Sequence, residues 1–245
     1  MRDKMETRAT SRPTYRARIE RIFDHADDVR SLFLRRLEAP LPSFVPGMFI
    51  SIAMPLGDEV RVRPYTITSS PEERDAFEIV FNRVPGGAGA AWLFARQGGE
   101  EVEFTGPFGA FTLERAPDAE TIFIAESTAI APIRPMLRRL LKQSPAARVN
   151  LLYFADRADH LLYREELEGL RGAHPQFTLS MEVVTQSAES RWAAIIAKVR
   201  RRWIERDADR SRHFYICGVG AGVLELRDLL RAAGYERRAI RYERW

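Results

Sequence analysis

The chain has 245 residues, 45% of them hydrophobic, and this length predicts one or two domains, of which we favour two. Its 38 lysines and arginines exceed its 34 acidic residues, and the formal net charge of +4 is compatible with anionic ligands or acidic partners without identifying either. The single cysteine, Cys217, excludes an internal disulfide, a cysteine-ligated iron–sulfur cluster and a zinc ribbon within these residues.

The amino-terminal residues are charged and polar. The segment MRDKMETRATSRP lacks the apolar stretch of a signal peptide, and the sequence contains no run of about 18 apolar residues that could span a bilayer. We therefore expect a soluble, cytoplasmic protein without a membrane span, in which residues 1–13 form a flexible tail.

Residues 14–116 contain short β-like segments separated by turn residues. The predicted strands cover residues 15–23, 29–37, 49–55, 63–69, 77–84 and 101–113. Six short strands at this spacing predict a small antiparallel β-barrel.

Residues 117–245 alternate between strand and helix patterns, after a boundary at Ala116-Pro117-Asp118. Strands are expected at residues 121–126, 148–155, 177–184, 213–220 and 238–245, and helices at residues 132–143, 163–171, 192–203 and 221–234. This order predicts an α/β domain with a doubly wound parallel sheet.

The stretch RVRPYTITSSP, residues 61–71, carries side chains that the packing of a strand does not require. A strand places Arg63 and Tyr65 on one side, so a flat ligand could lie against the tyrosine ring while the arginine binds a phosphate through two bonds. The stretch VPGGAGAAWLF predicts a glycine turn that enters a helix, where free amide groups suit a pyrophosphate. The glycines of GPFGAF permit close approach of the backbone where the barrel closes.

These motifs resemble those of ferredoxin–NADP reductase-like flavoproteins. RPYTITSS is similar to their flavin-binding R-x-Y-[ST] signature, VPGG…WL to their pyrophosphate loop and GPFGAF to their G-P-x-G-x-F closing turn. In the second half, IAPIRPML resembles the end of their nucleotide loop and the helix after it, LLYREEL their L-Y-x-x-E-L helix, and FYICGVG their Y-x-C-G-P turn. The motifs occur in the family's order from about Tyr15 to Trp245.

The resemblance implies FAD as the cofactor and NADPH or NADH as the substrate. It implies that Arg63 binds a flavin phosphate, that Tyr65 lies against the isoalloxazine ring, and that the Thr66 hydroxyl faces the flavin nitrogen that accepts hydride. The positions that it assigns to cofactor binding are Arg63, Pro64, Tyr65, Thr66, Thr68, Gly86, Gly87, Ala88, Thr128 and Gly218. Ala90 stands where many relatives have a phosphate-binding serine, and the loss of one such hydrogen bond costs about 1 kcal/mol.

The loop AESTAIAP, residues 125–132, departs from the family pattern A-G-G-T-G-I-A-P because all three glycines are replaced. Glu126 introduces an anion where the pyrophosphate of NAD(P)H is expected, and Ser127 and Ala129 add side chains to the turn. One interpretation is poor nucleotide affinity. The alternative is that Glu126 stabilises the start of a helix, typically by less than about 1 kcal/mol.

The resemblance also implies catalytic roles near the carboxyl terminus, beside those of Tyr65 and Thr66. Cys217 falls where the family places a cysteine beside the reacting carbon of the nicotinamide, and the alternative is a buried strand residue. Trp245 corresponds to the terminal aromatic that covers the flavin in many relatives, and the alternative is packing between domains. Glu243 resembles an acidic residue near the nicotinamide, or is a surface charge.

Basic residues form two clusters in the sequence. They predict either solvated helix faces or a docking surface for an acidic electron carrier such as ferredoxin or flavodoxin. Arg157 and Arg191 are candidates for binding the extra phosphate of NADP, and none of the four histidines is at the spacing of metal ligands. The clusters are Arg138, Arg139 and Lys142, and Lys198, Arg200, Arg201, Arg202, Arg206, Arg210 and Arg212.

The sequence therefore predicts an FAD-dependent oxidoreductase that transfers hydride from NAD(P)H to flavin and passes electrons to a separate acceptor. The alternative is a flavoprotein with a degenerate nicotinamide site that acts as a regulatory or electron-transfer module with a different donor. A basic barrel that binds nucleic acid is the extreme alternative, and we do not expect a nucleic-acid partner.

Overall fold

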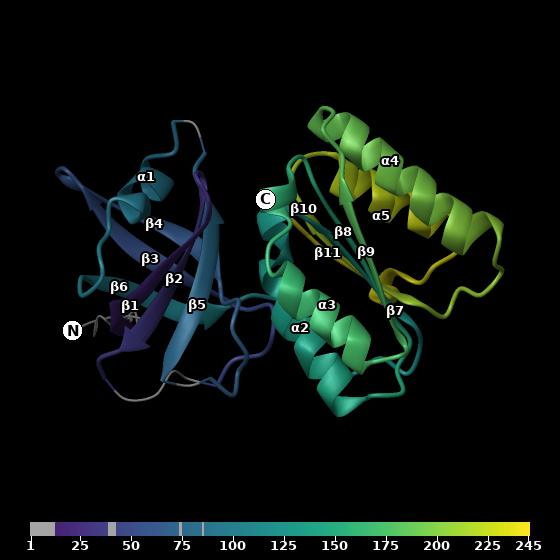
Figure 1. Cartoon of the computed structure of the whole chain (residues 1–245), viewed down its shortest axis with the longest axis horizontal. Coiled ribbons are helices and arrows are strands. Elements are labelled where there is room, and N and C mark those ends of the chain that lie inside the picture. The colour runs from purple at the N-terminus through teal and green to yellow at the C-terminus, as the bar shows by residue number, and fades with distance from the viewer. Residues whose placement is uncertain (1–12, 39–42, 74, 85) are drawn as a thin grey trace, which may run out of the picture.

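The computed structural model describes residues 13–38, 43–73, 75–84 and 86–245, which form two units with separate β-sheets (Figure 1). Residues 1–12 of the expected flexible tail lie outside the described residues. The domain boundary at residues 116 and 117 stays a prediction. The last strand of the first sheet ends at Phe108 and the first strand of the second sheet begins at Thr121.

The first sheet is a closed antiparallel barrel. Its strands are paired in the order β4-β3-β6-β1-β2-β5, and a bridge between Ile67 and Ile79 joins the chain after β4 to β5. Alternate side chains such as Ile50, Ile52 and Met54 point inward and are fully buried. The predicted six-stranded barrel is confirmed. The strands are β1 (Thr14–Ala26), β2 (Val29–Arg36), β3 (Phe49–Leu56), β4 (Glu59–Thr66), β5 (Ala76–Asn82) and β6 (Glu101–Phe108).

Several barrel strands differ in their bounds from the prediction, and β1 extends to Ala26, three residues beyond its predicted end. Strand β4 begins four residues earlier, because a tight turn with Gly57 at φ 65° pairs Leu56 with Glu59. This first part of β4 alternates charged residues with Val60 and Val62, and all of these residues are exposed. Strand β6 ends before the predicted residue 113. The short helix α1 (Ala88–Phe94) follows β5 and packs Leu93 into the barrel core.

The second sheet is parallel, with strand order β11-β10-β7-β8-β9. Helices α2 (Ile130–Gln143) and α3 (Arg164–Ala173) cover one face, and α4 (Ala188–Arg200) and α5 (Gly222–Ala232) cover the other (Figure 1). Strands β7 and β8 are buried along their whole length, as expected of parallel strands with helices on both faces. The predicted doubly wound sheet is confirmed.

The strands of this sheet are β7 (Thr121–Glu126), β8 (Val149–Ala155), β9 (Phe177–Val183), β10 (His213–Gly218) and β11 (Ile240–Arg244). Short 3-10 turns occupy Ser127–Ala129, Ala158–His160 and Arg237–Ala239, and a π turn, Arg201–Glu205, extends α4. Helix α4 begins before the predicted residue 192, because Ser187 caps it by accepting a hydrogen bond from the Ser190 amide. Within the described residues, no helix combines the length and apolar composition needed to cross a bilayer.

A buried polar cluster joins the two sheets. Arg134 of α2 donates from Nη1 to Glu78 Oε2 of the barrel at 2.7 Å and from Nη2 to Glu166 of α3 at 2.7 Å. The hydroxyls of Tyr163 and Ser31 donate to Glu78 Oε1 at 2.7 and 2.6 Å. We call these five residues the interdomain cluster. It fixes the unit with the parallel sheet against β5, and β5 also lines a cavity between the two units.

Candidate functional site

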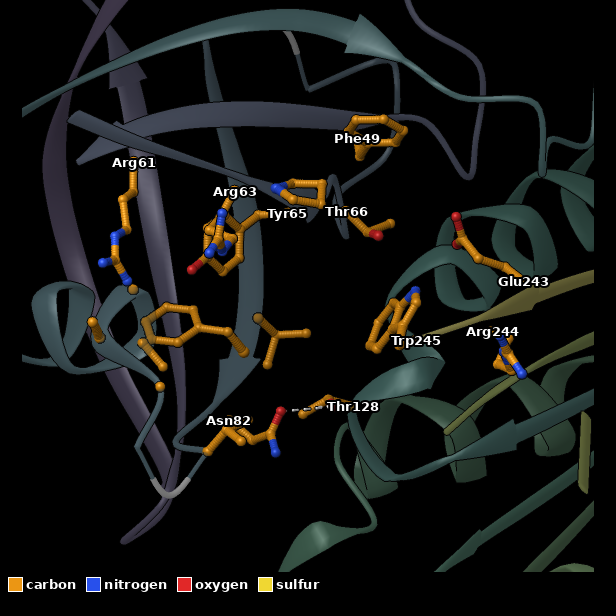
Figure 2. Close-up of a pocket in the computed structure, with 18 of the residues that line it drawn as sticks. Phe49, Arg61, Arg63, Tyr65, Thr66, Asn82, Thr128, Glu243, Arg244 and Trp245 are labelled. Atoms are coloured by element: carbon orange, nitrogen blue, oxygen red, sulfur yellow. Dashed lines mark hydrogen bonds between the residues drawn. The ribbon is translucent and has the colours of Figure 1, made fainter. Parts of the chain in front are cut away.

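A cavity of about 690 Å³ lies between the barrel and the end of strand β11 (Figure 2). Its barrel side is built by β3, β4, β5 and the loop that leads into α1. Its other side is built by Thr128, after β7, and by the three carboxyl-terminal residues. Of the residues that the sequence assigned to cofactor binding or catalysis, nine line this cavity: Arg63, Pro64, Tyr65, Thr66, Gly86, Gly87, Ala88, Thr128 and Trp245.

The aromatic wall of the cavity centres on Tyr65. Its ring lies edge-on to Phe81 with the ring centres 5.7 Å apart, which fixes the orientation of the phenol. Burial raises the pKa of Tyr65 to about 12, so the hydroxyl stays protonated at neutral pH. Thr66 ends β4 opposite Phe49 in the strand register. The strand therefore presents a ring and, next to it, a hydroxyl to the same cavity.

Arg63 is a cation available to an anionic ligand in this cavity, which Arg61 and Arg244 also line. Its Nη1 donates to the Val62 carbonyl at 2.9 Å, and among the described residues no carboxylate pairs with it. Arg61, two residues earlier on β4, pairs with Glu59, and its Nη2 lies 3.5 Å from Glu59 Oε2. A guanidinium without a carboxylate partner at the wall of a cavity suits a phosphate.

A glycine loop leads into α1, and the first turn of this helix brings backbone close to Arg63. Gly86 has φ 74°, a conformation that a residue with a side chain rarely adopts. A Cβ atom at Gly89 would lie 3.4 Å from Cγ of Arg63 and 3.3 Å from the Met54 sulfur, so the glycine permits this contact. The cavity thus combines an aromatic wall, an arginine and a glycine loop, and these residues fit a flavin with a pyrophosphate.

The carboxyl terminus faces this wall. Figure 2 shows Trp245 on the side opposite Tyr65, and the Trp245 amide donates to the Gly218 carbonyl at 3.0 Å. The Trp245 side chain is 43% exposed, so it is not a core residue. Burial raises the pKa of Glu243, although a hydrogen bond with Trp245 opposes that shift, and Glu243 Oε2 is buried without a hydrogen-bond partner among the described residues.

Three assigned residues do not line the cavity. Thr68 is fully buried, and its hydroxyl donates to the Thr66 carbonyl at 3.4 Å. Cys217 is fully buried in the core beside α2, and burial, with the nearby Glu243 charge, raises the pKa of its thiol well above its usual value. Gly218 ends β10 behind Trp245. The structure favours the packing interpretation of Cys217, and the functional roles of all three stay predictions.

Sequence reasoning missed several cavity residues. Phe49 and Asn82 line it from β3 and β5, and Asn82 Oδ1 accepts a hydrogen bond from Thr128 Oγ1 at 3.5 Å (Figure 2). Arg244, at the end of β11, also lines it. No local pattern marks these residues, because their proximity to the site arises from strand pairing within the barrel for Phe49 and from the packing of the two units for the contact of Asn82 with Thr128.

The carboxylate of Glu126, at the end of β7 in the altered loop, accepts hydrogen bonds from three N–H groups of the protein. Glu126 is 5% exposed, and its Oε1 accepts a hydrogen bond from Arg191 Nε at 3.1 Å. Its Oε2 accepts from Trp192 Nε1 at 2.9 Å and from the Val219 amide at 3.2 Å. Ser127, with φ 50°, takes a conformation that the missing glycine would adopt more readily. Glu126 is therefore a paired, buried carboxylate.

The basic clusters predicted from the sequence are largely engaged within the protein. Arg138 pairs with Glu73 and Glu166, and Arg202 donates to Asn150. Arg210 donates to five backbone carbonyls, and Arg212 pairs with Glu120 and Asp207. The two candidates for an NADP phosphate are paired as well, Arg157 with Asp159 and Arg191 with Glu126.

A different basic surface lies next to the cavity. An open hollow of about 690 Å³ is lined by four arginines from α5, the turn after it and β11, together with Phe111 and Glu243. Glu243 also lines the first cavity, so the two adjoin. Burial lowers the pKa of His213 on the neighbouring strand, and the charges of Arg238 and Arg241 lower it further. We call Arg231, Arg237, Arg238 and Arg241 the basic hollow.

An aromatic and arginine-lined cavity of this kind, between a closed barrel and a doubly wound sheet, defines a two-domain flavin-dependent oxidoreductase. Residues 18–113 match the family model described as oxidoreductase FAD-binding domain, and residues 123–223 match the model described as oxidoreductase NAD-binding domain. The chain belongs to the ferredoxin–NADP reductase-like family of flavoproteins.

Several known proteins are similar over most of this chain. Ferredoxin–NADP reductase B of Sorangium cellulosum is 29% identical over 240 residues, which cover 94% of this chain and 97% of that protein. A glycine betaine monooxygenase reductase subunit of Pseudomonas aeruginosa is 26% identical, and the match covers 89% of this chain and 61% of the relative. The chain thus spans about three fifths of that longer relative.

Solved structures share the fold. The cytochrome P450 reductase GcoB of Amycolatopsis aligns with a TM-score of 0.81 at 24% identity, over 96% of this chain and 71% of that chain. A ferredoxin NADP+ reductase from Neisseria gonorrhoeae, solved with bound FAD and NADP, aligns with a TM-score of 0.78 at 18% identity, over 94% and 98% of the two chains.

Proposed function

We propose that this chain takes a hydride from NADH or NADPH with FAD as its cofactor and delivers electrons to a separate redox protein. The observation that carries this proposal is the cavity in which the barrel residues Arg63, Tyr65 and Thr66 face Trp245 and Thr128 of the other unit. A donor bound to one unit and a flavin bound to the other would meet there.

The protein's own residues bind and orient the reactants. When bound, FAD accepts two electrons as hydride and can release them one at a time. Arg63 neutralises the charge of a flavin phosphate, and Tyr65 supplies a flat surface for the ring system. The Thr66 hydroxyl supplies a donor at the edge of that surface. Trp245 excludes water from the ring until a nicotinamide replaces the indole.

The electron acceptor is proposed to be an acidic carrier protein of the ferredoxin or flavodoxin type. The basic hollow supports this, because it adjoins the cavity and because an acidic surface docked there would lie close to the flavin. Such encounters are accelerated by opposite charges and slow at high salt. Replacement of Arg237 and Arg238 by glutamate should slow electron transfer to an acidic acceptor, whereas the same change at the exposed Arg200 and Arg201 should leave it unaffected.

A second candidate function is a regulatory flavoprotein with a different electron donor, and the paired carboxylate of Glu126 in the nucleotide loop favours it. One experiment separates the two candidates. The purified protein should release FAD on heating, identified by chromatography against FMN. Anaerobic mixing with NADH or NADPH should bleach its flavin absorbance. A flavin that neither nucleotide reduces would refute the proposed reductase and favour the regulatory flavoprotein.

A further inference from the structure

The two halves of the parallel sheet diverge between β7 and β10. The chain runs from β7 outward to β8 and β9, and then returns to place β10 on the other side of β7. In open parallel sheets, a dinucleotide binds at the carboxyl ends of the strands at such a switch point. Glu126 ends β7 and Gly218 ends β10, so both residues lie at this crevice.

Three N–H donors converge on the Glu126 carboxylate in this crevice. They are the Arg191 guanidinium, the Trp192 indole and the Val219 amide, at 3.1, 2.9 and 3.2 Å. Arginine and backbone amides are the donors that bind phosphates in proteins. In this protein the Glu126 side chain already accepts hydrogen bonds from these donors.

Trp192 holds this arrangement in place. A Cβ atom at Gly218 would lie 2.4 Å from the indole, and one at Gly222 would lie 2.1 Å from it, so the ring packs directly against the end of β10 and the start of α5. Trp192 is 2% exposed, and its ring also meets Phe154 edge-on at 5.1 Å. The indole is therefore fixed, whereas Arg191 of the same helix has a long side chain that can change its partner.

We propose that Glu126 is an internal anion that competes with the phosphates of NAD(P)H for Arg191 and thereby sets a low affinity for the nucleotide. This inference rests on the proposed function, because it concerns the donor of that reaction. Nucleotide binding replaces the Arg191–Glu126 ion pair with an Arg191–phosphate ion pair. The loss of the first pair offsets part of the free energy gained from the second. It also leaves a buried carboxylate without its cation, which is unfavourable.

The test is the affinity of the intact flavoprotein for NAD+ and NADP+, measured by calorimetry so that no turnover occurs. Glu126→Gln keeps the shape of the side chain and an acceptor for Trp192, but it removes the charge that holds Arg191. We expect the Kd of at least one nucleotide to fall tenfold or more, equivalent to about 1.4 kcal/mol. Binding should also become more sensitive to salt, because a free guanidinium then meets the phosphate.

Two further variants identify the cause. Glu120 pairs with Arg212 at 2.6 Å before β7, at the opposite end of the same strand, so Glu120→Gln is a matched control that should not change nucleotide affinity. In the double variant Glu126→Gln/Arg191→Gln, the gain in affinity should disappear. The melting temperature of each variant shows whether it is folded.

Each outcome bears on the inference. It is overturned if Glu126→Gln binds nucleotide no more tightly than the wild type, if the gain persists without Arg191, or if Glu120→Gln gives the same gain. Reduction of the wild-type flavin by nucleotide together with an unchanged Kd in Glu126→Gln would overturn this inference alone. If neither the wild type nor any variant binds or is reduced by either nucleotide, the proposed function fails with it.

Discussion

Replacement of Arg134 by methionine is expected to weaken the junction between the two units. The Arg134 and Glu78 side chains are 12% and 4% exposed and lie 2.7 Å apart across the interface. Methionine fills much of the same volume but leaves the Glu78 carboxylate buried without a cation. The Tyr163 and Ser31 hydroxyls remain as its hydrogen-bond donors.

Loss of one partner from a buried ion pair typically costs about 3–5 kcal/mol. For a chain of this size, each kcal/mol lowers the melting temperature by roughly 2–4 °C, so Arg134→Met should melt roughly 6–20 °C below the wild type. The FAD content should be unchanged, because the cavity residues Arg63, Tyr65 and Thr66 belong to the barrel. Reduction of the flavin by NAD(P)H should slow, since it requires the two units to stay in register.

The assay follows melting by circular dichroism and by release of flavin fluorescence. Arg138→Met is the matched control. Arg138 also reaches Glu166 from α2, but its side chain is 36% exposed, and an exposed pair contributes about 0–1 kcal/mol. The double variant Arg134→Met/Glu78→Gln should lose less than the sum of the two single variants, because the residues act as a pair. A loss below about 1 kcal/mol in Arg134→Met, or strictly additive losses, would refute the reasoning.

Three further predictions concern the cavity and the interface. Tyr65→Ala should raise the Kd for FAD about fivefold or more, because an aromatic contact contributes about 1 kcal/mol beyond burial, whereas Tyr65→Phe should retain the affinity in titrations of the apoprotein. Deletion of Trp245 should shift the flavin spectrum and tighten nucleotide binding roughly two- to tenfold, and an unchanged spectrum and Kd would place the indole in packing alone. His160 bonds Asp28 of the barrel and Asp156 of its own unit; burial lowers its pKa, but these two bonds outweigh burial and raise it. Its contribution to stability should therefore be complete below about pH 6.5 and be lost as the pH rises through the raised pKa, so melting curves of His160→Gln should fall below those of the wild type at pH 6 and approach them in alkaline buffer.

Local patterns in the sequence predicted every strand and the four long helices of the fold. Period-two alternation marks strands such as β3, and the alternation of strand and helix marks the parallel sheet, because each pattern reports burial of one element against a core. The predicted starts of two elements are wrong because their first residues are mostly polar or charged. The start of β4 has only two apolar residues, Val60 and Val62, between charged ones, and the first turn of α4 is polar; a glycine turn and a serine cap define these two starts.

The barrel half of the cavity was also accessible from sequence, since Arg63, Pro64, Tyr65 and Thr66 are consecutive on one strand. Of the cavity residues from the other unit, Thr128 and Trp245 were assigned from the family resemblance, whereas Arg244 was not. Asn82 meets Thr128 across 46 residues, and the basic hollow sets Phe111 of the linking segment beside arginines of residues 231–241. Such contacts depend on how two folded units pack, which no local pattern encodes.

Whether a charged side chain of this protein is free to bind a ligand depends on its ion-pair and hydrogen-bond partners more than on the number of charges in the sequence. The arginine-rich stretch at residues 198–212 suggested a docking face, yet Arg210 and Arg212 serve mainly to close loops and pair with buried acids. In the same way, Glu126 suggested a repelling anion in the nucleotide loop, but Arg191 neutralises it at 3.1 Å. Glu126 is therefore expected to weaken nucleotide binding by competing with the phosphates for Arg191, and not by simple repulsion of the phosphates. That distinction is measurable, because repulsion predicts that Glu126→Gln still tightens nucleotide binding when Arg191 is absent, whereas competition predicts that this gain disappears.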